Sequence, residues 1–133
     1  MNAQVTSALN EYQSTDNSSV AYADPHELIV RLMDGALDRI AQAKCAIEQH
    51  NIQQKGERLS KAIAIIGGLS SCLDHDKGGE ISTNLNNLYE YMNLRLFEAN
   101  IEEDTSKLDE VSGLLKDIRD AWVAINPELE NVG

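Results

Sequence analysis

Apolar side chains recur every three or four residues along most of this chain, the spacing that places them on one face of an α-helix. The first such pattern follows Asp24 and Pro25. Asp24 can cap the free backbone N–H groups, Pro25 suits the first helical position, and Glu27 completes a capping box. A helix is therefore predicted from residue 24 to about residue 50. Its expected buried face consists of Ile29, Met33, Ala36, Ile40, Ala43 and Ile47.

Three more helices are predicted after the first. The second runs from about Gln54 to Leu73 and is followed by a polar break, 74–79, that ends in two glycines. The third ends near Asn100, and the fourth starts near Asp104 and ends before Pro127. Their expected buried faces are Leu59, Ile63, Ile66, Ser70 and Leu73, then Ile81, Leu85, Leu88, Met92, Arg95 and Ala99, then Leu108, Val111, Leu115, Ile118, Trp122 and Ile125.

The fold class follows from these elements. No segment shows the strict alternation of apolar and polar residues that is typical of a half-buried strand, and short connections favour antiparallel neighbours. The prediction is an all-α protein, an antiparallel four-helix bundle (up-down-up-down) over residues 24–126. Residues 1–23 are rich in Ser, Thr, Asn and Gln and are expected to form a flexible N-terminal tail, or a short helix over a groove. Residues 127–133 are expected to form a C-terminal tail.

The charge balance narrows the function. Eleven Lys and Arg stand against 22 Asp and Glu, a net charge of -11 over 133 residues. Such a surface repels phosphate backbones and anionic lipids, so neither a nucleic acid nor a membrane is an expected partner. No secretory signal or membrane-length apolar run is present, which favours a cytoplasmic protein. Its two cysteines, Cys45 and Cys72, are then expected to be reduced thiols.

Motifs for chemistry are incomplete. The run 74–85 resembles a calcium-binding loop but has Gly78 and Leu85 where carboxylate ligands are needed. None of the three histidines has the Glu-x-x-His spacing of a di-iron bundle, and Gly67-Gly68 has no following Lys to bind phosphate. Ser70 and Ser71 lack the glycine elbow of a nucleophile. We therefore expect no catalytic, cofactor or metal site, and a protein that is not an enzyme.

The predicted apolar faces are wider than one buried seam requires. A bundle needs a broad apolar face in any case, so each additional residue could simply be core. The alternative is that some of them line a groove for the helix of a partner. The candidates for such a groove are Leu28, Leu32, Tyr89, Tyr91, Leu94 and Leu96, with Tyr12 and Val20 as apolar residues of the tail.

The predicted third helix carries the most specific pattern in the chain. Residues 78–100 read GGEIxxNLxxLYxYMxxRLxxAN, and Asp34-Gly35-Ala36 and Asp120-Ala121-Trp122 extend the match into two other predicted helices. Together these residues closely resemble the FliS family of flagellar secretion chaperones. The resemblance covers about residues 20–122.

The resemblance implies a function that periodicity alone does not. Family members bind the C-terminal segment of newly made flagellin in the cytoplasm, prevent premature polymerisation and deliver it to the flagellar export apparatus. The client wraps around the bundle, and the N-terminal tail is expected to occupy part of the groove when no client is bound. Some members also bind an anti-sigma factor. The alternative hypothesis is a regulatory helical-bundle adaptor that binds an amphipathic helix of another protein.

Overall fold

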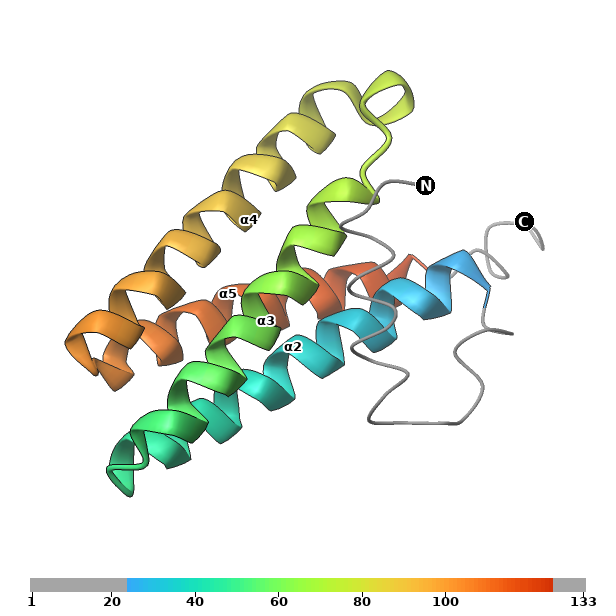
Figure 1. The fold of residues 1–133 in the computed structure, drawn as a ribbon. Coiled ribbons are helices and arrows are strands. Elements are labelled where there is room, and N and C mark those ends of the chain that lie inside the picture. The colour runs from blue at the N-terminus through green and yellow to red at the C-terminus, as the bar shows by residue number, and fades with distance from the viewer. Residues whose placement is uncertain (1–23, 126–133) are drawn as a thin grey trace.

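The structure, a computed structural model, describes residues 24–125, and these are helical almost throughout (Figure 1). The helices are α2 (Pro25–Glu48), α3 (Ile52–Ser71), α4 (His75–Glu102) and α5 (Thr105–Ala124). Within the described range no residue lies in a β-strand, so the predicted all-α class is confirmed. The two tails, with Tyr12 and Val20, lie outside the described residues.

Each helix begins at a polar cap. Asp24, Asn51, Asp74 and Asp104 precede the four helices, and each accepts a hydrogen bond from a backbone N–H of the first turn at 2.7 to 3.1 Å. The first four N–H groups of a helix have no partner within it, so a short side-chain oxygen at this place stabilises the start. The cap predicted at Asp24 is confirmed, with Glu27 as the donor.

The predicted break at 74–79 is only partly correct. Asp74 caps a further helical turn, so α4 begins at His75, before the two glycines. Residues 72–74 separate α3 from α4, and within α4 the helix is interrupted at Gly79, whose φ of 52° and ψ of -123° are not helical. Glycine reaches this conformation at little cost because it has no Cβ. The last polar residues of the expected loop therefore form the first turn of α4, separated from the rest by a kink.

The four helices form a closed ring of neighbours. α2 packs on α3, α3 on α4, α4 on α5, and α5 returns to α2, in the up-down-up-down order (Figure 1). The side chains that meet in the centre are almost fully buried. They are Leu32, Met33, Ala36, Ile40, Ala43, Leu59, Ala62, Ile65, Ile66, Leu69, Tyr89, Met92, Leu96, Ala99, Leu108, Val111 and Leu115.

The buried face of α4 differs from the predicted one. Met92 and Ala99 are buried as expected, but Tyr89 and Leu96 are buried where Leu88 and Arg95 were predicted. Leu88 is partly exposed, and Arg95 turns toward α5, where its Nε lies 2.7 Å from Oε1 of Glu110. Rotating the helix in this way keeps the guanidinium out of the apolar centre, where an ionised group would be costly.

Polar contacts between helices fix the register around the ring. On the α2–α5 side, Arg119 Nε donates to Asp34 Oδ1 at 2.8 Å, and Lys44 Nζ lies 2.9 Å from Asp109 Oδ1. On the α3–α4 side, the buried Lys55 donates to the carbonyl of Asn100 at 3.0 Å. The two α2–α5 ties run in antiparallel order, so the start of α2 lies beside the end of α5.

Candidate functional site

An apolar cavity of about 220 Å³ opens at one end of the bundle, and all four helices contribute to its wall. The wall consists of Ile29 and Met33 of α2, Leu69 of α3 with Cys72 and Leu73 directly after it, Leu85 and Tyr89 of α4, and Ile118, Ala121 and Trp122 of α5 with Ile125 directly after it. No Asp, Glu, Lys or Arg is among them. We call this space the end cavity.

The arrangement of the helices explains where the end cavity forms. The start of α2 and the end of α5 diverge from the end of α3 and the start of α4, as Figure 1 shows. Because the two pairs separate there, the side chains of the core no longer fill the space between them, and apolar surface is left open to solvent. Apolar surface in contact with water is unfavourable, so binding of an apolar side chain from another molecule in this space would be favoured.

The polar groups in the wall of the end cavity are held neutral. Burial raises the pKa of Tyr89 to about 12, and burial also raises the pKa of the Cys72 thiol. Both groups are therefore uncharged at neutral pH. A cavity with neutral, largely apolar walls favours aliphatic or aromatic side chains over charged ligands.

Exposed apolar side chains extend the surface beyond the end cavity on α4 and just after α5. Ile81 and Leu88 lie on the first half of α4, and Ile81 is 70% exposed. Ile125 directly follows α5, borders the cavity and is itself 52% exposed. An amphipathic helix that placed one side chain in the cavity would meet further apolar contacts on both sides.

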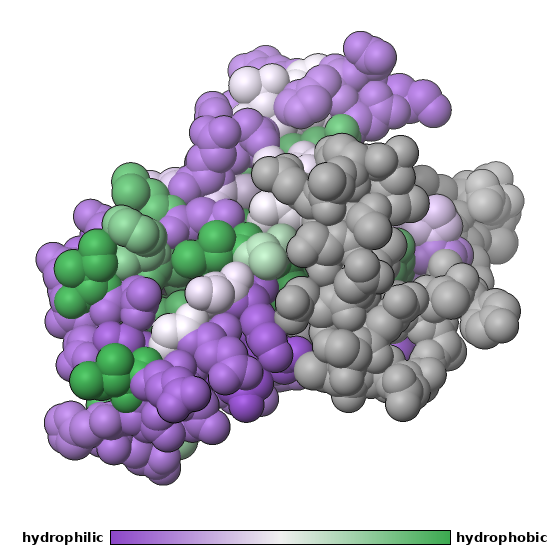
Figure 2. All heavy atoms as spheres, in the orientation of Figure 1, coloured by the Kyte–Doolittle hydropathy of each residue, from purple (hydrophilic) through white to green (hydrophobic). Residues whose placement is uncertain are grey.

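A second apolar surface lies at the other end of α4. Leu94, Phe97 and Ile101 follow one another at helical spacing on the outer side of α4, and each is more than half exposed. Ile52, at the start of α3, is 69% exposed and lies near the same end of the bundle, where Lys55 contacts Asn100. We call these four residues the α4 patch. Figure 2 shows apolar surface where the second half of α4 and the start of α3 lie.

The end cavity and the α4 patch use different faces of α4. Leu85 and Tyr89 point toward the bundle, whereas Phe97 and Ile101 point to solvent. Between Leu85 and Ile101 the helix rises about 24 Å, at 1.5 Å per residue. A ligand that covered both surfaces would therefore have to be long and to pass around α4. Large apolar side chains that gather on an exposed face, as in the α4 patch, typically mark an interaction site.

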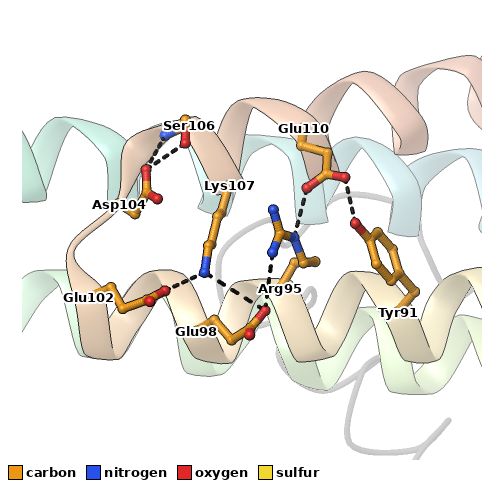
Figure 3. Close-up of polar contacts among 8 residues, drawn as sticks. All are labelled: Tyr91, Arg95, Glu98, Glu102, Asp104, Ser106, Lys107 and Glu110. Atoms are coloured by element: carbon orange, nitrogen blue, oxygen red, sulfur yellow. Dashed lines mark hydrogen bonds and ion pairs between the residues drawn. The ribbon is translucent and has the colours of Figure 1, made fainter.

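A polar network holds the second half of α4 against α5 (Figure 3). The Tyr91 hydroxyl donates to Glu110 Oε2 at 2.6 Å, and Arg95 Nε donates to Glu110 Oε1 at 2.7 Å. Hydrogen bonds from Tyr91 and then Arg95 hold the pKa of Glu110 below its ordinary value. Lys107 of α5 pairs with Glu98 and Glu102 of α4, which closes the network.

The six predicted groove residues separate into three groups. Tyr91 and Leu94 are exposed, as expected for contact residues, and Leu28 is half-buried against the core. The exposure expected for Leu32, Tyr89 and Leu96 is wrong. Leu32 and Leu96 are 0% exposed, and the side chain of Tyr89 is 3% exposed because the buried face of α4 is rotated relative to the prediction. Tyr89 still belongs to the site, as part of the cavity wall.

The sequence pattern predicted several residues of these two surfaces as core residues, or did not single them out. Ile118, Trp122 and Ile125 fit the expected buried face of the fourth helix, yet they line an open cavity. Phe97 and Ile101 of the α4 patch were not among the candidates. The signal that could have revealed them is the excess of apolar residues on α4, which has apolar side chains on two faces. The cavity itself depends on how helix ends diverge, which no single helix encodes.

Residues 24–125 do not have the features of a metal site or of a membrane-spanning helix. No three His, Cys, Asp or Glu side chains cluster there as metal ligands would. None of the helices in that range is both long enough and apolar enough to cross a membrane. Cys45 and Cys72 are both free thiols.

An acidic helical bundle with an open apolar cavity and a separate apolar patch defines a class of protein that binds segments of other proteins. A family model described as "Flagellar protein FliS" matches residues 8–129, which is nearly the whole chain. The chain belongs to the FliS family.

Characterised relatives agree with this assignment. The flagellar secretion chaperone FliSB of Pseudomonas aeruginosa is 49% identical over 120 residues, which cover 90% of this chain and 95% of the relative. The flagellar secretion chaperone FliS of Salmonella typhimurium is 48% identical over 117 residues, 87% of each chain. The protein of that name from Bacillus subtilis is 41% identical over 113 residues, 85% of this chain and 84% of the relative.

Proposed function

We propose that this protein is a cytoplasmic, non-catalytic chaperone that binds the C-terminal segment of flagellin, prevents its premature polymerisation and delivers it to the flagellar export apparatus. The observation that carries the proposal is the end cavity. It is open and without charged groups, and its wall comes from all four helices of a member of the FliS family. A cavity of about 220 Å³ is large enough for an apolar side chain and too small for a folded partner.

The two apolar surfaces support a client that is extended. We propose that one helix of the client places apolar side chains in the end cavity, and that a later part of the client covers the α4 patch. The two surfaces lie on different faces of α4. A client chain that wraps around this helix therefore fits them better than a rigid globular partner does. A disordered segment that folds on binding can cover such a surface, although ordering it lowers the affinity gained per unit area.

The energetics suit a carrier that must release its client. Each square ångström of apolar surface buried contributes roughly 25 cal/mol, and the cost of ordering the client offsets much of that gain. The client is then bound and released as other apolar surfaces compete with the chaperone for it, with no chemical step. The net charge of -11 keeps a protein with this much exposed apolar surface soluble.

A titration with a labelled flagellin C-terminal peptide tests the proposal. Wild type is expected to bind at micromolar concentration or tighter. Ile125→Ser at the cavity and a Leu94→Ser, Phe97→Ser double variant at the patch should each weaken binding by about tenfold or more. These three residues are largely exposed, so the helical circular dichroism should not change. Ala41→Ser, at an exposed position of α2 outside both surfaces, is the matched control.

Two results would count against the proposal. If wild type forms no complex with the flagellin peptide at micromolar concentration, the client assignment fails. If an unrelated amphipathic helix binds as tightly as the flagellin segment, the regulatory adaptor is the better interpretation, because a dedicated chaperone must discriminate between helices.

A further inference from the structure

His26 and Trp122 form a closed pair although 96 residues separate them in sequence. The Trp122 indole Nε1–H donates to the carbonyl of His26 at 3.0 Å. In return, His26 Nε2 lies 2.7 Å from the carbonyl of Trp122. Since a carbonyl can only accept, Nε2 must carry the proton of the imidazole. The two rings also stack, with centroids 4.9 Å apart and planes 14° from parallel.

The pair joins two helix ends. His26 lies in the first turn of α2, and Trp122 lies in the last turn of α5. The Trp122 carbonyl accepts the backbone N–H of Ile125 at 3.2 Å, and His26 adds a second, closer donor from another helix. The next tie between these helices is the Asp34–Arg119 ion pair, two turns further along α2. The pair therefore ties the terminal turn of α5 directly to the first turn of α2.

The same pair borders the end cavity. Trp122 is a wall residue, and its neighbours in the wall include Ile29 of α2 and Ile125 directly after α5. His26 is not a wall residue. It stacks on the indole and donates to the backbone behind it, so the position of the indole in the wall depends on a residue that an incoming side chain would not touch.

We infer that His26 is a positioning residue for client binding. Its contacts with Trp122, which we call the latch, hold the last turn of α5 against α2 and keep the cavity wall in its binding shape. The inference rests on the proposed function, because it assigns the end cavity to a client. Loss of the latch lets the terminal turn of α5 fray, and the wall formed by Trp122 and Ile125 loses its fixed shape. A preformed wall binds more tightly than one that must be ordered during binding.

The free protein provides the first test, because Trp122 is its only tryptophan. The single indole N–H signal in a ¹H–¹⁵N spectrum therefore reports on the latch without any client. His26→Ala is expected to raise the exchange rate of that proton with solvent by about tenfold or more, since local opening exposes it. Intrinsic fluorescence should shift to longer wavelength. His75→Gln, an exposed histidine at the start of α4, should change neither signal.

Two further variants separate the parts of the latch. His26→Gln keeps a donor near the place of Nε2 and loses the ring, whereas His26→Phe keeps the ring and loses the donor. Each should show slower indole exchange than His26→Ala. If His26→Ala melts the whole bundle, these milder variants provide the test, with the melting temperature measured alongside.

Client affinity provides the second test. With the flagellin C-terminal peptide, His26→Ala should raise Kd by about tenfold, mainly through faster dissociation, and His26→Gln should recover part of the loss. Unchanged indole exchange in His26→Ala would overturn the latch. Faster exchange with an unchanged Kd would overturn its role in binding. If wild type binds no peptide while indole exchange still responds to His26→Ala, the proposed function and the positioning role fail and only the structural tie remains.

Discussion

At the level of single residues, two leucines of α4 that are only two positions apart are expected to have different roles, one in binding and one in stability. Leu94 is 56% exposed and belongs to the α4 patch, whereas Leu96 is 0% exposed and lies in the core. Residues two apart on a helix point in nearly opposite directions, because each residue turns the helix by about 100°. The same change in side-chain volume therefore has a different consequence at each position.

Replacing these two leucines should give opposite phenotypes. Leu96→Ala removes buried methyl groups and leaves a cavity, so the free energy of unfolding should fall by about 2–5 kcal/mol. Leu94→Ala removes only surface contacts, so it should change the free energy of unfolding by less than about 0.5 kcal/mol. It should nevertheless weaken binding of the flagellin peptide. Urea unfolding and peptide titration measure both. Equal destabilisation by the two variants would show that the assigned faces of α4 are wrong.

Glu110 should make the stability of the bundle depend on pH. Its hydrogen bonds from Tyr91 and Arg95 lower its folded pKa, so the ionised form stabilises the fold above the unfolded pKa of about 4.3. That contribution is lost as the pH falls through the folded pKa. Glu110→Gln should therefore lower the melting temperature at pH 7, by up to about 4 °C for an exposed network.

The difference between Glu110→Gln and wild type should shrink as the pH falls below the unfolded pKa and through the lowered folded pKa, because the wild-type carboxyl then becomes protonated as well. Thermal melts at pH 7, 5 and 3.5 measure this. Glu90→Gln, at an exposed position of α4 where the carboxylate accepts a hydrogen bond from Asn86, is the control and should melt close to wild type at pH 7. A constant difference in melting temperature between Glu110→Gln and wild type across the pH range would show that Glu110 acts through its shape and not its charge.

At the level of helices, periodicity predicted most of the fold. The cap at Asp24, the helix start near Asp104 and the buried residues Leu108, Val111 and Leu115 follow from local rules that a single sequence displays. The face of α4 does not, because it carries apolar residues on two sides. Its rotation is decided by partners on another helix, such as Glu110, which pairs with Arg95.

The candidate site was harder to predict than the fold for the same reason. Tyr91 and Leu94 could be selected because they exceed what one seam needs, but Leu32 and Leu96 meet that criterion equally and are buried. The end cavity depends on the divergence of helix ends and on the position of Trp122 against His26, far away in sequence. Pattern within one helix contains no information on either.

Two glycines in helices should respond to alanine in opposite directions. Gly79 has a φ of 52°, so a Cβ there is strained and Gly79→Ala should lower the free energy of unfolding by about 1–3 kcal/mol. Gly67 lies within α3, and a Cβ built on it meets no atom within 4 Å. Gly67→Ala should therefore raise it by about 0.5–1 kcal/mol. Chemical denaturation measures both, and a loss of stability at Gly67 would contradict the open surface there.

At the level of the whole molecule, the ring of four helices explains how a small protein can present a binding site without unfolding. The core closes the middle of the bundle, while the helix ends diverge around the end cavity and the outer face of α4 stays apolar. Because all four helices contribute to the cavity wall, occupation of the cavity must depend on the assembled bundle. A client bound there should also stabilise the fold, since it binds only the native state.

The two cysteines of the chain offer a test of where a client sits. Both thiols are exposed, but Cys72 lines the end cavity, whereas Cys45 lies on the second half of α2, about 18 Å along the helix from the wall residue Met33. Both are free, so both can be alkylated. A saturating flagellin C-terminal peptide should slow alkylation of Cys72 by about tenfold or more, because a thiol must be accessible to react. The rate at Cys45 should not change.

Mass spectrometry of the digested protein resolves the two sites in one sample, so Cys45 serves as the internal reference for reagent and time. Ile125→Ser, which weakens the cavity wall, should remove the protection of Cys72 at the same peptide concentration. The Leu94→Ser, Phe97→Ser double variant should reduce the protection of Cys72 only to the extent that less peptide is bound in the end cavity. Protection of Cys45 with Cys72 still reactive would place the client on the outer face of α2 and would contradict the assignment of the end cavity as the client site.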